Sequence, residues 1–375
     1  MYALPTILLL SAVLQVAVQA QFVPPSEGPL VASTNYVGAS NGSLPKTQLV
    51  PGKAFNRIIN IWLENTDFLS AVSSVAFNEL ASQGILLDQY CAVTHPSEPN
   101  YIGAIGGDFF GLSDDNLYHI PPNISTVVDL LEAKNISWAS YQENMPYDGF
   151  EGFNFSSKNY VNTSAPDYVF YWVFVTPNMV NDGHDTSVDY AGQWLDFWLV
   201  PLLSNPNFND DQTLVVLAFD ENESYTENNC VLTLLLGDAV PQNLRGTTDS
   251  TYFTHYSLLS TVEANWGLGS LGRGDTNKTL SNVFSFVADA TGYTNTDVSS
   301  NSMLTNATGT IPGPLNPVLY VPFTAPNTAA VGAGGGPVFI GPGLDTSFTA
   351  DVAPPPVNLT AQNKTVPWLG PRTSS

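Results

Sequence analysis

Short, continuous apolar runs alternate along this chain with segments whose apolar residues recur at helical spacing. A continuous apolar run of strand length is typical of a strand that is buried on both faces of a sheet. Strands are predicted at residues 57–63, 84–93, 136–141, 171–175, 212–219 and 230–236. Helices are predicted at residues 68–82, 126–134, 190–204 and 256–266. This alternation predicts an α/β fold in which a mostly parallel central sheet is flanked by helices.

Two of the predicted helices carry clear end signals. Ser125 is expected to cap the helix at residues 126–134, because a serine side chain can accept a bond from the first free amides of a helix. His255 heads the helix at residues 256–266, and Gly267 is expected to stop it.

Composition changes outside residues 51–300, which we expect to form one catalytic domain. Residues 1–20 are apolar, end in small residues and resemble a secretory signal, although the basic residues usual at its start are missing. Residues 21–50 are rich in Pro, Ser, Gly and Asn, which predicts an extended lead-in. Residues 301–375 are rich in Pro, Gly, Ala and Asn and predict a partly ordered tail, in which 318–323 and 337–340 could pair with other segments.

The chain is strongly acidic, with 10 Lys and Arg against 33 Asp and Glu and a formal net charge of −23 at pH 7. Nucleic acid and anionic membrane surfaces are therefore unfavourable partners. Self-repulsion would weaken near pH 4 as carboxylates approach neutrality, so the composition favours a protein that tolerates acid. Because no later segment has eighteen consecutive apolar residues, we expect a soluble, secreted protein, extracellular or associated with the cell wall, with no stable membrane anchor.

Polar side chains that can carry chemistry follow four of the predicted strands. Because the carboxyl ends of parallel strands meet at one edge of a sheet, we expect these side chains to lie close together. They are Glu64, Ser97, Asp182, His184, Asp185, Asp220 and Glu221. Each of them alone is usually a turn former or a helix cap. Four such positions that combine carboxylates, histidine and a serine between prolines favour a catalytic centre instead.

Ser97 lies between Pro96 and Pro99, which hold the backbone in a fixed bend. A hydroxyl presented in this way can act as a nucleophile, provided that a neighbouring group lowers its pKa. A metal ion that bridges Glu64, Asp220 and the Ser97 oxygen would stabilise the alkoxide and polarise a phosphoryl oxygen.

The identity of this divalent metal ion stays open. Carboxylate and amide oxygens favour a hard or borderline cation, while histidine also admits zinc or iron. Asn65 or Asn100 could hold a second oxygen of the phosphoryl group.

Five segments, in chain order, closely resemble motifs of the secreted fungal acid phosphatases. They are Leu63-Glu-Asn-Thr-Asp-Phe68, Thr94-His-Pro-Ser-Glu-Pro-Asn-Tyr101, Thr176-Pro-Asn-Met-Val-Asn-Asp-Gly-His-Asp185, Ala218-Phe-Asp-Glu-Asn-Glu-Ser224 and Thr254-His-Tyr-Ser-Leu-Leu-Ser-Thr-Val-Glu263. These enzymes belong to the phosphoesterase family, which also includes bacterial phospholipases C and respiratory-burst-inhibiting acid phosphatases. That family lies within the alkaline phosphatase superfamily. The resemblance runs from about residue 57 to 290 and implies an alkaline-phosphatase-like core.

The resemblance also implies roles for individual residues. Ser97 matches the nucleophile and Asn100 a phosphate contact. The implied metal cradle consists of Glu64, Asn65, Ser97, Asp220 and Glu221. His184 and His255 match histidines that bind a second metal or the phosphate and assist the leaving group. Asn65 and Asp185 are expected beside the substrate, with Asp182 as nearby support.

The other two histidines have plainer interpretations. His95 adjoins the nucleophile and is expected to pack against the turn, with a direct role as the alternative. His119 lies in a loop flanked by proline and is expected at the surface.

The sequence departs from the fungal pattern between the aromatic loop and the Thr-Pro-Asn motif. Relatives carry a longer stretch there, with a Lys-His-Asn-Pro-like segment, whereas here residues 159–169 run almost directly into residues 170–178. A basic wall and one histidine of the pocket would then be missing. Either a true deletion or an error in the predicted coding sequence explains the departure.

The function expected from these features is that of a secreted acid phosphatase that hydrolyses small-molecule phosphomonoesters through a phosphoserine intermediate. One alternative is a phospholipase C-like phosphodiesterase, which would need room for a second ester arm. The other is a catalytically impaired glycoprotein that binds phosphate esters.

Two further features agree with secretion. Asn-x-Ser/Thr sequons predict N-linked glycans, although Asn222 directly follows candidate metal ligands and is the poorest acceptor. The sequons begin at Asn41, Asn123, Asn135, Asn154, Asn162, Asn222, Asn277, Asn306, Asn358 and Asn363. Cys91 and Cys230 lie near the predicted site, where a disulfide and a pair of buried free thiols are both compatible with the sequence.

Overall fold

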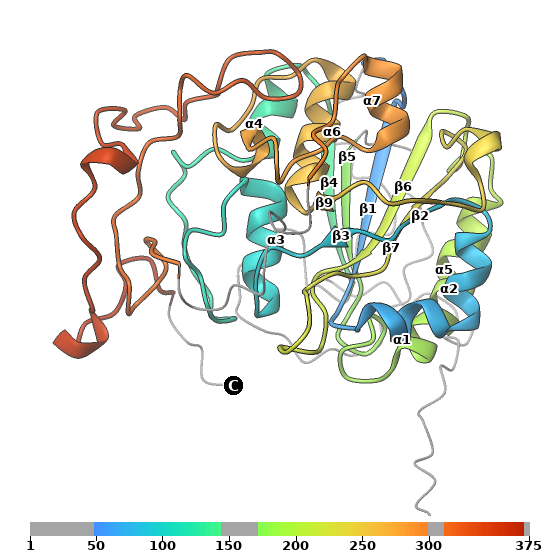
Figure 1. Cartoon of the computed structure of the whole chain (residues 1–375), viewed down its shortest axis with the longest axis horizontal. Coiled ribbons are helices and arrows are strands. Elements are labelled where there is room, and N and C mark those ends of the chain that lie inside the picture. The colour runs from blue at the N-terminus through green and yellow to red at the C-terminus, as the bar shows by residue number, and fades with distance from the viewer. Residues whose placement is uncertain (1–48, 144–171, 299–310, 371–375) are drawn as a thin grey trace, which may run out of the picture.

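The structure is a computed structural model that describes residues 49–143, 172–298 and 311–370. Its centre is a seven-stranded sheet with the strand order β4-β5-β1-β6-β7-β2-β8 (Figure 1). The predicted signal segment at residues 1–20 and nearly all of the predicted lead-in at residues 21–50 lie outside the described residues, as does the shortened segment at residues 159–169.

Four neighbouring strands of the sheet are parallel. They are β4 (Trp138–Gln142), β5 (Trp172–Thr176), β1 (Arg57–Leu63) and β6 (Thr213–Phe219). All of β6 is buried, and so is β1 after its first residue, as their continuous apolar runs predict. β7 (Thr233–Leu236) is antiparallel to β6, β2 (Ile85–Leu87) is antiparallel to β7, and β8 (Thr247–Asp249) is parallel to β2. The predicted mostly parallel sheet is confirmed.

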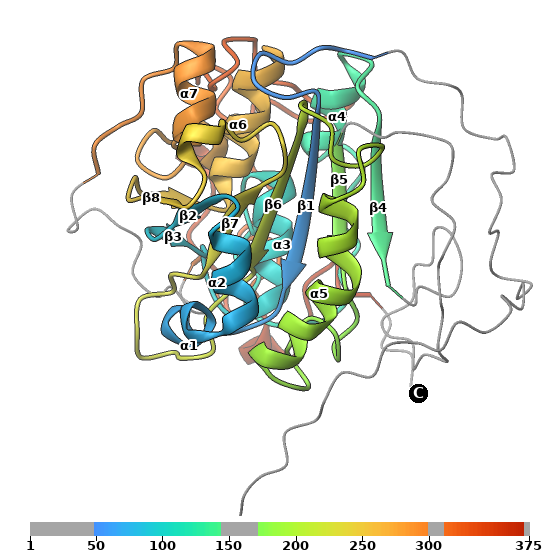
Figure 2. The ribbon, with the colours of Figure 1, turned by 90° about the vertical axis from the view of Figure 1, so that its right-hand side faces the viewer.

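Helices cover both faces of this sheet (Figure 2). One face carries α2 (Val75–Ala81) and α5 (Val188–Leu203), with α1 (Phe68–Ser73) leading into α2. The other carries α3 (Ser97–Gly106), α4 (Val127–Glu132) and α6 (Tyr256–Trp266), with α7 (Ser285–Thr291) packed against α6. Short 3-10 helices occur at Gln242–Leu244, Gly274–Thr276, Ala350–Val352 and Thr360–Gln362.

The helix α6 has the bounds that its end signals predict, and Gly267 ends it in the left-handed conformation with φ 60°. Every residue of α6 is buried, so its polar side chains must find partners inside the protein. Asn265 finds its hydrogen-bond partners in the backbone just before β1. Its Oδ1 accepts from the amides of Ala54 and Phe55 at 2.8 and 3.2 Å, and its Nδ2 donates to the Phe55 carbonyl at 2.9 Å.

Local details differ from the sequence prediction in three places. The run at 84–93 forms two short strands rather than one, and the second, β3 (Tyr90–Cys91), leaves the main sheet to pair with β9 (Phe253–Thr254). The predicted helix at 68–82 is divided at Ser74, which has extended dihedral angles. Thr126, not Ser125, caps α4, because the reciprocal capping box forms between Thr126 and Asp129.

Cys91 and Cys230 form a disulfide, so the structure selects this alternative over free thiols. The bridge ties the end of β3 to the chain that follows β6 and closes a sequence separation of 139 residues.

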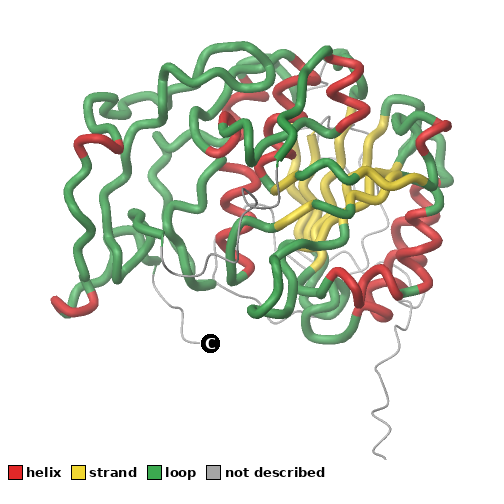
Figure 3. The backbone as a smooth tube through the Cα atoms, in the orientation of Figure 1, coloured by secondary structure: helices red, strands yellow, loops and turns green. Residues whose placement is uncertain are grey.

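The described part of the tail, residues 311–370, runs over the α3, α4 and α6 side of the molecule mostly as irregular chain (Figure 3). Leu315, Phe323 and Trp368 of the tail pack with Ile102 of α3 and Phe110 in a separate apolar cluster. The two tail segments expected to pair do so through single bridges, Tyr320 with Gly313 and Val357, and Val338 with Ser270. Side-chain packing therefore holds these residues in place where backbone ladders are few.

Candidate active site

The carboxyl ends of β1, β5 and β6 bring three acidic segments together. The backbone amide of Glu64, which follows β1, donates to the Asp182 carbonyl at 3.2 Å, and Asp182 lies in the loop after β5. The Asp220 amide, after β6, donates to the Leu63 carbonyl at 3.0 Å, and the Asn65 amide donates to Asp220 Oδ1 at 3.2 Å. Parallel strands thus place residues that are far apart in sequence at one edge, as predicted.

Ser97 joins this edge as the first residue of the ten-residue helix α3, directly after the cis peptide bond between His95 and Pro96. Its hydroxyl donates to Glu221 Oε1 at 3.1 Å. The serine and the acidic segment after β6 are therefore in direct contact.

Asn100 was expected to contact phosphate, but the structure gives its side chain another task. It is fully buried, and its Oδ1 accepts from the amides of Val93 and Thr94 at 3.0 and 3.2 Å. Its Nδ2 donates to the carbonyls of Thr94 and Pro96 at 2.9 and 3.1 Å. Since a carboxamide offers two donors and two acceptor positions, none is left for a substrate, and Asn100 instead fixes the turn that presents Ser97.

The carboxylates at this edge are buried together. Burial raises the pKa of Asp220 well above its ordinary value, and the charges of Glu64 and Glu221 raise it further. Burial and the Glu64 charge likewise raise the pKa of Asp182 to about 8. The pKa of Glu64 is also raised by burial, although the hydroxyl of Tyr101 donates to its Oε1 at 2.7 Å. The site therefore concentrates negative charge that favours a bound cation or proton.

The donor atoms fit a hard divalent cation in their chemistry. Asp220 and Asp182 are 0% and 1% exposed, and each has one buried carboxylate oxygen, Oδ2, without a hydrogen-bond partner among the described residues. Such oxygens are the ligands that hard cations prefer. However, within residues 49–143, 172–298 and 311–370, no three Asp, Glu, His or Cys side chains are gathered as a ready coordination shell.

Glu221 is held by two partners at once. While its Oε1 accepts from Ser97, its Oε2 forms an ion pair with Nδ1 of His95, which is fully buried. The ring of Tyr225 stacks on the His95 ring with centroids 4.2 Å apart. His95 therefore contacts the site through Glu221, beyond the packing role expected for it.

His184 lies at the mouth of the site. Its side chain is 37% exposed, and Nδ1 lies 3.0 Å from Asp185 Oδ1. Its backbone amide donates to Asp182 Oδ1 at 2.9 Å, and its charge lowers the pKa of Glu64. Asp185, expected beside the substrate, has a side chain that is 58% exposed and faces His184.

His255 was expected to assist the leaving group, and here the structure corrects the sequence interpretation. The side chain is fully buried and packs edge-on against Trp62 at 5.0 Å between centroids. Its Nε2 lies 2.5 Å from the Asp220 carbonyl, which can only accept, so Nε2 carries the proton and Nδ1 accepts from the Tyr90 hydroxyl at 3.0 Å. Burial also lowers the pKa of His255 to about 4. This histidine therefore supports the Asp220 backbone from behind and does not face the substrate.

Three residues with contacts at the site had no role in the sequence interpretation. Tyr101 bonds Glu64, and Asp115 accepts from the Glu98 amide at 2.9 Å in the first turn of α3. Tyr225 covers His95. Tyr101 and Tyr225 adjoin or fall inside recognised motifs, which is the only signal that could have found them, whereas Asp115 lies in a loop without any pattern. His119 is exposed, as expected.

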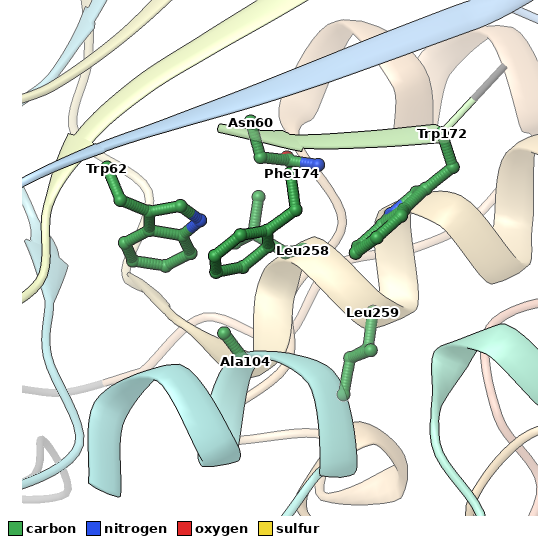
Figure 4. A pocket seen from close by; sticks show the side chains of 7 residues that line it. All are labelled: Asn60, Trp62, Ala104, Trp172, Phe174, Leu258 and Leu259. Atoms are coloured by element: carbon green, nitrogen blue, oxygen red, sulfur yellow. The ribbon is translucent and has the colours of Figure 1, made fainter. Parts of the chain in front are cut away.

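Neither of two cavities in the described structure is lined by these residues. A small space of about 10 Å³ lies between the sheet, at Trp62 and Phe174, and the helices α3 and α6, at Ala104 and Leu258 (Figure 4). It has room for about one water molecule. A larger, apolar groove of about 380 Å³ lies between α4 and the tail, lined by Leu130, Lys134, Phe339 and neighbouring residues.

Comparison with known proteins adds an independent finding. The model of the Phosphoesterase family matches residues 67–172 and 166–269. An acid phosphatase from Aspergillus fumigatus is 43% identical over 309 residues, which cover 73% of this chain and 68% of that protein. A probable acid phosphatase from Kluyveromyces lactis is 43% identical over 323 residues, covering 77% and 75%. A phosphate-repressible acid phosphatase from Penicillium chrysogenum is 43% identical over 299 residues, covering 71% of each chain.

Solved structures resemble the fold more distantly. A protein in the alkaline phosphatase superfamily from Vibrio parahaemolyticus aligns with a TM-score of 0.40 and 11% identity, over 60% of this chain and 70% of that chain. A phosphonate monoester hydrolase from Silicibacter pomeroyi aligns with a TM-score of 0.42 and 8% identity, over 65% and 78%.

Proposed function

The chain belongs to the Phosphoesterase family, and from this we propose that it is an acid phosphatase that hydrolyses small-molecule phosphomonoesters. This chain covers more than two thirds of the length of each of the three relatives described above. The observation that carries the proposal is the 3.1 Å contact of the Ser97 hydroxyl with Glu221 at the carboxyl end of β6.

Ser97 is the proposed nucleophile. Its hydroxyl donates to Glu221 Oε1, so Glu221 is placed to take the proton as the serine oxygen attacks phosphorus. The ion pair with His95 keeps the other oxygen of Glu221 occupied and the carboxylate turned toward Ser97. The Oγ–P bond forms as the bond from phosphorus to the leaving oxygen breaks, which yields a phosphoserine.

His184 is the proposed acid for the leaving group, because its side chain is exposed at the mouth of the site whereas His255 is enclosed. The protonated imidazole gives its proton to the departing alkoxide. In the second half of the reaction, the neutral ring accepts a proton from the water that attacks the phosphoserine. Ser97 leaves with the electrons of the broken Oγ–P bond and recovers its proton from Glu221.

A divalent cation is part of the proposal because phosphate esters are anionic and the site is acidic. In the described ranges, the ion pairs made by Lys and Arg side chains join Arg57 to Asp210 and Arg245 to Asp238, away from these carboxylates. A bound cation would offset the charge of the ester and lower the pKa of the serine hydroxyl. The residues that would hold it are Glu64, Asn65, Ser97 and Asp220. Glu221 belongs to the predicted set too, with its two oxygens now in contact with Ser97 and His95.

The replacement Ser97→Ala tests the proposal. We expect turnover of p-nitrophenyl phosphate to fall by at least about 1000-fold, because the group that forms the covalent bond is lost. Ser73→Ala, on the exposed side of α1, is the matched control and should keep full activity. Acid-quenched wild type incubated with a phosphate-labelled substrate should carry label on Ser97.

Two results would contradict this assignment. If Ser97→Ala turns over p-nitrophenyl phosphate as fast as wild type, Ser97 is excluded as the nucleophile. A wild type that cleaves bis(p-nitrophenyl) phosphate faster than the monoester would favour the phosphodiesterase alternative.

We also propose secretion with N-linked glycans. Four sequons, at Asn135, Asn277, Asn358 and Asn363, are exposed in the structure. Asn222 is 2% exposed, and its Nδ2 donates to the Ser224 carbonyl at 2.9 Å, which excludes it as an acceptor in the folded protein. Among the described residues, no helix has the length and apolarity needed to cross a membrane. Loss of mass after enzymatic deglycosylation of the secreted protein would test the glycans.

A further inference from the structure

An exposed aromatic ring lies beside the proposed nucleophile. Tyr225 is 59% exposed, and one face of its ring stacks on His95 with an interplanar angle of 23°. His95 in turn pairs with Glu221, which contacts the Ser97 hydroxyl. A short series of contacts therefore links the Tyr225 ring to the oxygen that would attack phosphorus.

The charges that act on Tyr225 come from carboxylates of the same site and its surroundings. Burial raises the pKa of its phenol, and the nearby carboxylates of Glu221 and Asp115 raise it further. Asp115 also raises the pKa of Glu64, so the same carboxylate acts on both Tyr225 and Glu64. The Tyr225 ring therefore lies near the carboxylates of the proposed site with part of its surface exposed.

The loop that carries Tyr225 is firmly held. The Ser224 amide donates to Asp67 Oδ1 at 2.9 Å, and the Asn222 amide donates to Asn229 Oδ1 at 2.8 Å. Asn229 Nδ2 donates to the Thr94 carbonyl at 2.6 Å, and the disulfide from Cys230 to Cys91 ties the end of the loop to β3. A ring held in this way loses little conformational freedom when a ligand stacks on it, so stacking can contribute to binding.

We propose that Tyr225 is a specificity-determining residue whose outward side stacks on the organic group of the substrate, so that phosphomonoesters of planar aromatic groups are preferred over those of saturated groups. This inference rests on the proposed phosphatase function and deepens it. The carboxylates beside Ser97 attract neither kind of group, whereas the exposed Tyr225 ring offers an apolar planar surface. Tyr225 then contacts the organic group of the ester and not its phosphate.

The test compares phenyl phosphate with cyclohexyl phosphate, two monoesters of similar size that differ in planarity. For Tyr225→Ala we expect KM for phenyl phosphate to rise about 3- to 10-fold, in keeping with the strength of an aromatic pair, while KM for cyclohexyl phosphate changes less than about 2-fold. Tyr225→Trp keeps a stacking ring and should keep the preference. Phe197→Ala, which removes a ring that is 44% exposed on α5, is the matched control and should change neither KM.

The outcomes separate this inference from the proposed function. If wild type hydrolyses both esters and Tyr225→Ala raises both KM values equally, or lowers kcat equally for both, Tyr225 only shields His95 and the inference is wrong. If wild type hydrolyses neither ester, the proposed function fails, and the inference fails with it.

Discussion

Glu263 offers a sharp test of how burial shapes the stability of this acidic protein. It lies in α6 with 0% exposure, and its Oε2 accepts from the Ala333 amide of the tail at 3.0 Å. Its Oε1 is also buried. Burial raises the pKa of Glu263 well above its ordinary value of 4.5, and the charge of the nearby Asp275 and a side-chain hydrogen bond with it raise the pKa further. The folded protein therefore holds a proton here that the unfolded chain releases.

This bound proton decides how the stability of the protein depends on pH. A raised folded-state pKa contributes stability that is present in full below the unfolded pKa, near 4.5, and is lost as pH rises toward the folded pKa. For one proton, the free energy of unfolding falls by up to about 1.4 kcal/mol per pH unit in that window. Between pH 5 and pH 7 this amounts to about 3 kcal/mol at most.

Glu263→Gln keeps the shape and the acceptor for Ala333 but cannot ionise. We expect the variant and wild type to be similarly stable at about pH 4.5, and the variant to become progressively more stable than wild type as pH rises. Denaturant midpoints between pH 4.5 and 7.5 measure the difference. Glu79→Gln, in the exposed part of α2, is the matched control and should follow wild type. Parallel curves for wild type and Glu263→Gln at every pH would refute the reasoning.

Three further predictions follow from contacts described above. Replacing Cys91 and Cys230 together by Ser removes a bridge across 139 residues and should lower the free energy of unfolding by about 4–5 kcal/mol, measured by denaturant unfolding. Asn265→Ala deletes three hydrogen bonds to residues 54 and 55, two of them buried, and should cost about 3 kcal/mol, seen as a lower Tm. Asp220→Asn should lower the divalent metal bound per mole, measured by elemental analysis, because it removes a charged ligand.

Each of these three has a result that would count against it. Equal midpoints for the double Ser variant and oxidised wild type would mean that the bridge contributes nothing. A cost for Asn265→Ala no greater than that of the exposed Asn205→Ala would deny the importance of its bonds. Unchanged metal content in Asp220→Asn, with Asp210→Asn as the control for an acidic residue away from the site, would remove Asp220 from the ligand set.

The sequence by itself determined the elements whose signals are local. The bounds of β1 and α6 agree with the apolar pattern and the end signals, and β6 starts one residue later than predicted. The gathering of Glu64 and Asp220 at one edge was also predictable, because the parallel strands β1 and β6 end together.

Other features depend on which segments meet, and only the tertiary structure decided them. The antiparallel direction of β7, the loss of β3 from the main sheet and the docking of the tail all arise from long-range packing that a local pattern does not encode. Asn100 and His255 stand in motifs that suggested contact with substrate, yet partners supplied by the fold use all of their polar atoms. A motif identifies the type of side chain, whereas burial and hydrogen-bond partners decide what that side chain can reach, and these are fixed only when the chain is folded.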